Sequence, residues 1–253
     1  MIMEPKYYMS FDIETTPLDW NTFSESQKEY WLRGAKTDEE IEEKMNRRSL
    51  TPLTSHIACI ACMIMEKKDD EWIEVKKGVL ATNPKLDIHS TSEEAYEETL
   101  VNDVKMIVSS EYKVLKNFWN LINYYRNVTL VSFNGRNFDA PFIMLRSALQ
   151  KIKPSRNLMA GTKFNYFNHI DLIDELTFYN GGSFGATQRF NFDFYAYSFG
   201  LHSPKADGVH GGMVPDLYAA GEIKEISEYC MRDVVATWQL FECWNQYLNF
   251  SNK

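Results

Sequence analysis

The sequence is poor in long apolar runs and in cysteine, and each shortage excludes a class of protein. Its 253 residues contain no run of about 18 apolar residues, the length a bilayer span needs. The first residues, MIMEPK, lack the charged and apolar regions of a signal peptide. Four cysteines are too few for a disulfide scaffold of this size, which agrees with a reducing compartment. We therefore expect a cytoplasmic protein with no membrane association.

Positive charge is also scarce. Lysine and arginine total 27 against 35 acidic residues, which gives a formal net charge of -8. The chain thus lacks the positive electrostatic potential expected of a protein that binds duplexes broadly and without sequence preference, although it could still bind a strand end locally. Hydrophobic residues make up 44% and aromatic residues 14%, enough for one substantial core. We expect a single domain over residues 1–253.

Cys59 and Cys62 form the one CxxC pattern of the chain. They lie in the apolar run IACIACMI, which is typical of a buried strand. An offset of three residues sends two strand side chains to opposite faces, so this spacing favours core packing over a metal site.

Periodicity and capping signals predict the order of elements along the chain. The residues between the first two expected strands, 18–52, form a helical insertion with two helix-start signals. The predicted strands are 7–14, 55–66, 72–79, 128–131 and 168–172, and residues 67–70 form a turn between the second and the third. The predicted helices are 90–127, an aromatic core helix over 194–201 and a helix over 223–238.

Asp12 and Glu14 stand at the end of the first expected strand. A period of two places both carboxylates on one face, while Ile13 points into the core. Two adjacent anions repel each other unless a cation or a shared proton intervenes, so the pattern suggests a divalent metal held by hard oxygen ligands. Taken alone, such a motif is more often a solvated strand edge than a metal site.

Two further acids have structural explanations as well. Asp139 follows a buried strand and a glycine-containing loop, and it suits the N-cap of a helix that has Pro141 in its first turn. Such a cap is worth about 1 kcal/mol. Tyr229 and Asp233 are four residues apart and share one helix face. An isolated motif of this kind usually consists of an exposed tyrosine and a solvated aspartate.

Three stretches taken together resemble a known family. FDIET, FNGRNFDAP and YCMRD follow one another in strand, loop-helix and helix contexts, and they resemble the three motifs of the DEDD 3′–5′ exonucleases. The tyrosine of the third motif is typical of the DEDDy branch. The sequence is most similar to the stand-alone exonucleases related to the proofreading domain of family B DNA polymerases. This resemblance implies an α/β ribonuclease H-like fold with a mixed five-stranded sheet in the order 3-2-1-4-5, flanked by helices.

The resemblance also implies roles for individual residues. The four acids Asp12, Glu14, Asp139 and Asp233 would hold two Mg²⁺ or Mn²⁺ ions, with Asp12 between them. Tyr229 would orient the attacking water. The residues that resemble contacts to the terminal nucleotide or could help place bases are Thr15, Asn134, Phe133 and Phe138. A core role explains both phenylalanines equally well.

The activity implied is two-metal-ion hydrolysis of single-stranded DNA from its 3′ end. The expected partner is a nucleic acid 3′ end. No polymerase module fits in the chain, so proofreading would act in trans with a polymerase or another replication or repair protein. An exoribonuclease of the same fold is an alternative, because the ribose 2′-OH is sensed by only a few local contacts. A non-catalytic nucleic-acid-binding module is another alternative, although such modules usually lose at least one acid.

Overall fold

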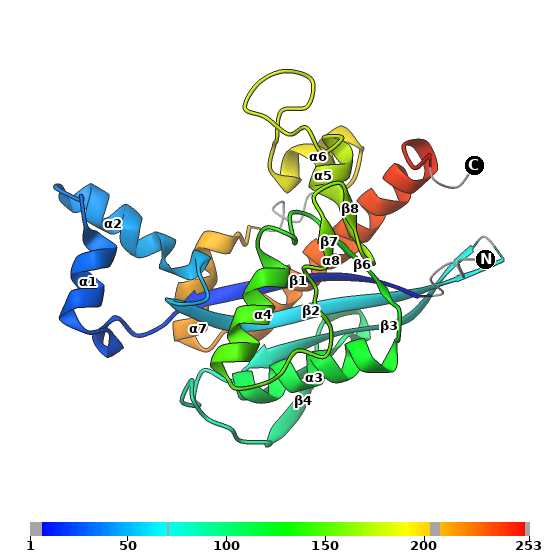
Figure 1. The fold of residues 1–253 in the computed structure, drawn as a ribbon. Helices are drawn as coiled ribbons and strands as arrows, with labels where there is room; N and C mark the ends of the chain where they lie inside the picture. The colour runs from blue at the N-terminus through cyan, green and yellow to red at the C-terminus, as the bar shows by residue number, and fades with distance from the viewer. Residues whose placement is uncertain (1–6, 70, 203–207, 251–253) are drawn as a thin grey trace.

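The computed structural model describes residues 7–69, 71–202 and 208–250. A mixed sheet with the strand order β4-β5-β3-β2-β1-β6-β9 runs through the molecule between layers of helices (Figure 1). Its strands are β1 (Tyr7–Pro17), β2 (Ser55–Lys68), β3 (Glu71–Thr82), β4 (Ala95–Thr99), β5 (Lys105–Ser109), β6 (Thr129–Ser132) and β9 (His169–Asp171). The five strands expected from the sequence are present in the expected order, and two more extend the sheet beyond β3.

Helices cover both faces of the sheet, and two more project from its end (Figure 1). The helices are α1 (Glu25–Leu32), α2 (Asp38–Asn46), α3 (Glu111–Tyr124), α4 (Asp139–Leu149), α5 (Leu172–Leu176), α6 (Phe192–Ser198), α7 (Val214–Ala220) and α8 (Ile223–Tyr247). Short strands β7 (Gly161–Thr162) and β8 (Asn165–Tyr166) form a separate hairpin. None of the helices within the described ranges is long and apolar enough to cross a membrane.

Two hydrophobic clusters fill the space on either side of β1 and β2. Met9, Phe11 and Ile13 pack with α3 and α4, whereas the opposite cluster contains Ile226 and Val234 of α8. Strand alternation therefore directs Ser10, Asp12 and Glu14 toward the α8 face. Cys59 and Cys62 belong to opposite clusters, as the offset of three predicts, and the four cysteines are free thiols.

The prediction of a helix over residues 90–127 is wrong for the first half of that range. Residues 95–99 and 105–109 pair as antiparallel strands, and the chain reverses between them through Asn102 and Asp103, which have positive φ. The helix begins only at Glu111, with Ser110 as its N-cap. Ser90 and Ser92, which suggest a helix start, instead accept local hydrogen bonds from the N–H groups two residues ahead.

Three smaller expectations also differ from the structure. Lys67 and Lys68 extend β2 rather than forming the turn, whose Asp70 lies outside the described residues. The aromatic helix α6 is mostly outside the core, since Ala196 is its one buried residue. Asp139 is the first residue of α4 rather than its cap, which is Phe138.

Residues 20–50 carry α1, α2 and two 3-10 turns, Trp20–Thr22 and Arg47–Leu50. Capping boxes at Ser24 and Thr37 start the two α-helices, as the sequence indicates. In Figure 1 these helices project from the end of β1, away from the helical layers.

Candidate metal centre

Asp12 and Glu14 lie on one face of β1, and both side chains are half-buried. The intervening Ile13 and the preceding Phe11 are buried on the other face, where they anchor the strand. The acids therefore face α8, because their neighbours in the strand are buried in the core on the opposite face.

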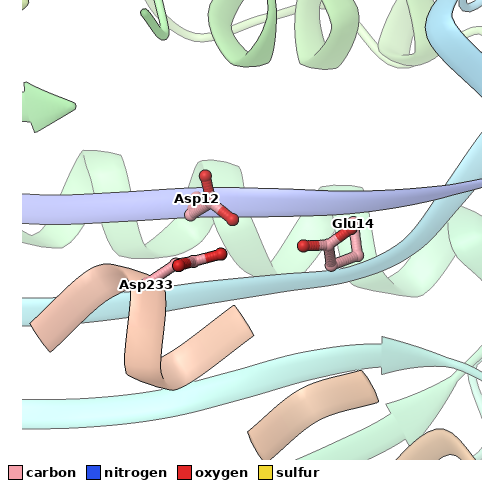
Figure 2. Close-up of side chains that lie close together, drawn as sticks. All are labelled: Asp12, Glu14 and Asp233. Carbon is pink, nitrogen blue, oxygen red and sulfur yellow. The ribbon is translucent and has the colours of Figure 1, made fainter. Parts of the chain in front are cut away.

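Asp233 approaches from α8. One carboxylate oxygen each from Asp12, Glu14 and Asp233 lies within 4.8 Å of the others, and Figure 2 shows the three side chains around a common space. The helix is held against the strand by the Ser10 hydroxyl, which donates a hydrogen bond to the carbonyl of Val234 at 2.9 Å. Packing of the helix on the strand thus brings Asp233 to Asp12 and Glu14, from which it is more than 200 positions distant in the sequence.

Asp139 lies beside this cluster but is not one of its three members. Strand β6 pairs with β1 only from Tyr8 to Ser10, so the backbone of Ile13 extends beyond it. The N–H of Ile13 donates to Asp139 Oδ1 at 3.0 Å. The fourth acid therefore fixes the strand segment between Asp12 and Glu14, and its carboxylate is buried.

Burial and mutual repulsion disfavour the charged forms of Asp12, Glu14 and Asp139. Burial, then the charges of Asp139, Asp233 and Glu14, raises the pKa of Asp12 well above its usual value. Burial likewise raises the pKa of Glu14 well above its usual value. Burial raises the pKa of Asp139 to about 7, although the hydrogen bond from Ile13 opposes that shift. A cation in this space would relieve the repulsion.

Tyr229 lies one helical turn before Asp233 and is buried. Burial raises the pKa of its phenol far above the usual value, and the charges of Asp233, Glu14 and Asp12 add to the rise. Its side chain also hydrogen-bonds Asp233. The phenol therefore stays protonated at neutral pH, and its one O–H donates to the Asp233 carboxylate.

The loop between β6 and α4 is shaped by an acid that the sequence did not reveal. The N–H groups of Asn134 and Arg136 donate to the Asp171 carboxylate at 2.7 and 2.8 Å. Asn134 has a φ of 65°, and a Cβ at Gly135 would collide with the Ser132 hydroxyl. The sequence signal that could have indicated this role is the position of Asp171 at the end of a predicted strand. That strand, β9, is parallel to β6, and Ser132 and Asp171 are in register.

Two of the predicted nucleotide-contacting residues adjoin acids in the sequence, Thr15 after Glu14 and Phe138 before Asp139, and the other two lie in the loop before α4. The Thr15 hydroxyl donates to the carbonyl of Ser49 at 2.7 Å, so it joins the end of β1 to the 18–52 segment. The Phe133 ring packs against Phe192, with ring centroids 5.0 Å apart, and that of Phe138 against Phe142 at 5.5 Å. Both phenylalanines are half-buried, so each has a core role, and their contact with a base stays a prediction.

Two thiols border the acids, and sequence reasoning gave neither a place in the site. Cys230 Sγ lies 3.5 Å from the carbonyl oxygen of Asp12 and 3.6 Å from its Oδ2. Cys59 hydrogen-bonds Cys230 and is the cross-strand partner of Glu14. Burial raises the pKa of Cys230 well above its usual value, so the thiol remains a protonated neighbour of the carboxylates.

Comparison with solved structures identifies the fold. The family B DNA polymerase from the hyperthermophilic archaeon Pyrobaculum calidifontis aligns with 95% of this chain at a TM-score of 0.52 and 14% sequence identity. The chain spans 25% of the length of that polymerase. This similarity confirms the expected ribonuclease H-like α/β class, with a seven-stranded sheet in place of the expected five strands.

Sequence comparison identifies the family. An uncharacterized protein of Methanocaldococcus jannaschii is 25% identical over 172 residues, which cover 62% of this chain and 92% of that protein. Residues 86–249 match the model of the predicted 3′–5′ exonucleases related to the exonuclease domain of PolB. That range includes Asp139, Tyr229 and Asp233, and the fold brings Asp12 and Glu14 to them from outside it. The chain therefore belongs to this family of predicted 3′–5′ exonucleases related to the exonuclease domain of PolB.

Proposed function

We propose that this protein is a metal-dependent exonuclease that hydrolyses single-stranded DNA from its 3′ end. The observation that carries the proposal is the convergence of Asp12, Glu14 and Asp233, whose oxygens lie within 4.8 Å of one another. Membership of the exonuclease family supports the reaction class.

The donor set fits Mg²⁺ or Mn²⁺. Both cations prefer carboxylate oxygens, and the three half-buried acids offer such oxygens at a spacing that one ion can bridge. Asp139 adds a fourth carboxylate next to this group, in keeping with a site for two ions. When bound, a pair of such ions activates water and neutralises the charge that develops on the departing oxygen of a phosphodiester.

Other residues of the chain would position the reactants. The protonated phenol of Tyr229 donates to Asp233 in this structure, and it would turn its O–H to the attacking water and orient it once a cation engages Asp233. Asp139 fixes the backbone between Asp12 and Glu14 through the N–H of Ile13. Asp171 fixes the loop that presents Asn134, which we assign to the terminal nucleotide. Each of these contacts limits the movement of a group that must be aligned for reaction.

The test is hydrolysis of a 5′-labelled single-stranded oligodeoxynucleotide in Mg²⁺, in Mn²⁺ and in EDTA. We expect a ladder that shortens from the 3′ end, release of mononucleotides, and no reaction in EDTA. A duplex of the same sequence should react more slowly, because its end must fray before it enters the site. The same sequence in RNA, used as a parallel substrate, should react more slowly than DNA.

Matched variants make this test specific. Asp233→Asn should abolish hydrolysis, whereas Glu225→Gln, an exposed acid on the same helix, should leave it unchanged. Cutting of circular single-stranded DNA as the main activity would contradict exonucleolytic action. Faster hydrolysis of RNA would replace the DNA assignment with an exoribonuclease.

A further inference from the structure

The chain exposes aromatic side chains in one region, between β7 and the end of α6. Six aromatic residues there are more than half exposed: Phe164, Phe167, Phe178, Phe184, Phe194 and Tyr197. We call these six side chains the aromatic surface. Phe184 and Tyr197 are 89% and 82% exposed, which is more than any other large hydrophobic residue in the described part of the chain.

The aromatic surface is not a general apolar patch. Between residues 161 and 200, all of which the structure describes, no leucine, isoleucine, valine or methionine is exposed. Leu172 and Ile173 of α5 are buried in the core, whereas Phe178, just after that helix, is exposed. The exposed large hydrophobic side chains of this region are therefore all aromatic, which suits a ligand that presents flat faces.

The segment that carries these rings is held in place by specific contacts. Arg189 forms an ion pair with Asp174, and the Tyr166 hydroxyl donates to the same carboxylate at 2.7 Å. Across the loop that carries Phe184, the Thr187 hydroxyl donates to the carbonyl of Asn180 at 2.9 Å. A loop tied at both ends can present its rings without a large loss of conformational freedom on binding.

The aromatic surface adjoins the loop that leads to the metal centre. Phe192 and Tyr195 of α6 pack on Phe133, with ring centroids 5.0 and 5.5 Å from it, and Phe133 directly precedes Asn134. Figure 1 shows α5, α6 and the long loop between them together on one side of the molecule, above α8. A strand whose 3′ end lies among the acids could thus continue over this region.

Two acids of the region are removed from the surface, and a lysine lies on it. Asp171 and Asp174 are buried, and their carboxylates are engaged by backbone N–H groups, by Tyr166 and by Arg189. Lys163, in contrast, lies at the surface with its ammonium group 5.8 Å from the centre of the Phe164 ring. A phosphate near these rings would meet a cation, and these two acids would lie beneath the surface.

We propose that the aromatic surface binds the single-stranded nucleic acid upstream of the 3′ end by stacking its bases. The inference rests on the proposed function, since the acid cluster defines where that end lies. Stacking on aromatic rings is tolerant of sequence and contributes about 10-fold or more in affinity for each base. It also explains how a chain with a net charge of -8 can hold a polyanion with few phosphate contacts.

The test compares two triple variants by fluorescence anisotropy, with 5′-labelled dT20 and dT4 in EDTA, which prevents hydrolysis. The surface variant combines Phe184→Ala, Phe194→Ala and Tyr197→Ala. The control combines Tyr30→Ala, Tyr124→Ala and Tyr247→Ala, which removes three similarly exposed rings elsewhere. Near-UV circular dichroism and thermal unfolding would establish that both variants fold.

We expect the surface variant to raise the Kd for dT20 at least 100-fold and the control to change it less than threefold. The turnover of dT4 in Mn²⁺ should stay within twofold of the wild type in both variants, because the acids are untouched. An unchanged Kd for dT20 in the surface variant would overturn the inference, as would a wild type that does not bind dT20.

Two other results separate this inference from neighbouring ones. A wild type that sediments as a dimer, together with a surface variant that is monomeric and binds dT20 normally, would make the aromatic surface an interface between copies and overturn the inference. A wild type that binds dT20 through these rings but does not hydrolyse it would support the inference and contradict the proposed exonuclease activity.

Discussion

The carboxylate of Asp139 accepts a hydrogen bond from the main-chain N–H of Ile13 at 3.0 Å. Ile13 stands between Asp12 and Glu14, so this one contact joins the start of α4 to the strand that carries two acids of the cluster. The contact gives Asp139 two separable properties, a negative charge and a hydrogen-bond acceptor. Substitutions that remove one or both properties have different expected effects.

Asp139→Asn keeps an oxygen that can accept from Ile13, whereas Asp139→Ala removes it. We expect both variants to lose at least 100-fold in hydrolysis rate, because both remove a carboxylate from the site. The free energy of unfolding of the alanine variant should be lower than that of the asparagine variant by about 1–3 kcal/mol, since alanine leaves a buried N–H without an acceptor. Urea unfolding in EDTA measures that difference, and equal stabilities would show that the contact does not hold the strand.

The acids make the metal-free protein less stable as pH rises. The pKa of Asp139 in the folded state is raised from 3.8 to about 7, so the folded state binds this proton more tightly than the unfolded state. Between these two pH values the unfolded state loses its proton first, and the contribution of Asp139 to the free energy of unfolding falls.

Urea unfolding in EDTA at pH 5 and pH 8 should therefore show a larger loss of stability for the wild type than for Asp139→Asn. Addition of Mn²⁺ at pH 8 should restore stability to the wild type, because a bound cation favours the charged acids. An equal pH dependence in the two proteins would mean that folding does not raise the pKa of Asp139.

Tyr229→Phe tests the role of the phenol. Because burial and the neighbouring acids keep it protonated, the phenol serves as a donor and not as a general base. We expect single-turnover hydrolysis to slow by about 10- to 1000-fold, with metal affinity nearly unchanged. The rate profile between pH 6 and pH 9 should keep its shape. A loss equal to that of Asp233→Ala would show that Tyr229 does more than orient water.

Acidic composition predicts distributive action on long strands. With 27 basic and 35 acidic residues, few phosphates can be neutralised, so binding should depend only weakly on salt concentration. Hydrolysis of a long labelled strand, followed after addition of excess unlabelled strand, measures how many nucleotides are removed in one encounter. Extensive degradation of the labelled strand after the trap is added would contradict this expectation.

Periodicity was sufficient to place the acids on their elements. A period of two assigned Asp12 and Glu14 to one face of a strand, and helical spacing assigned Tyr229 and Asp233 to one face of α8. These assignments depend on local patterns of apolar residues, which β1 and α8 retain strongly. The hairpin of β2 and β3 was predicted within a few residues for the same reason.

The edge of the sheet depended on tertiary contacts and was not predictable in the same way. β4 has the sequence AYEET, whose charges suggest an exposed helix, and it becomes a strand by pairing with β5. The roles of Asp171 and Cys230 depend on register and packing between distant segments. No local pattern contains that information.

The central claim is that the three-acid cluster holds the cation on which hydrolysis depends. The most direct measurement is a Mn²⁺ titration followed by electron paramagnetic resonance, with the single-turnover rate on single-stranded DNA measured at each concentration. For the wild type and for the exposed-acid control Glu225→Gln, binding and rate should rise together. Asp12→Asn should lose the binding and the rate, although the folded protein should be at least as stable in EDTA because a repelling charge is gone. Wild-type Mn²⁺ affinity in Asp12→Asn, or full hydrolysis by the wild type in EDTA, would contradict the claim.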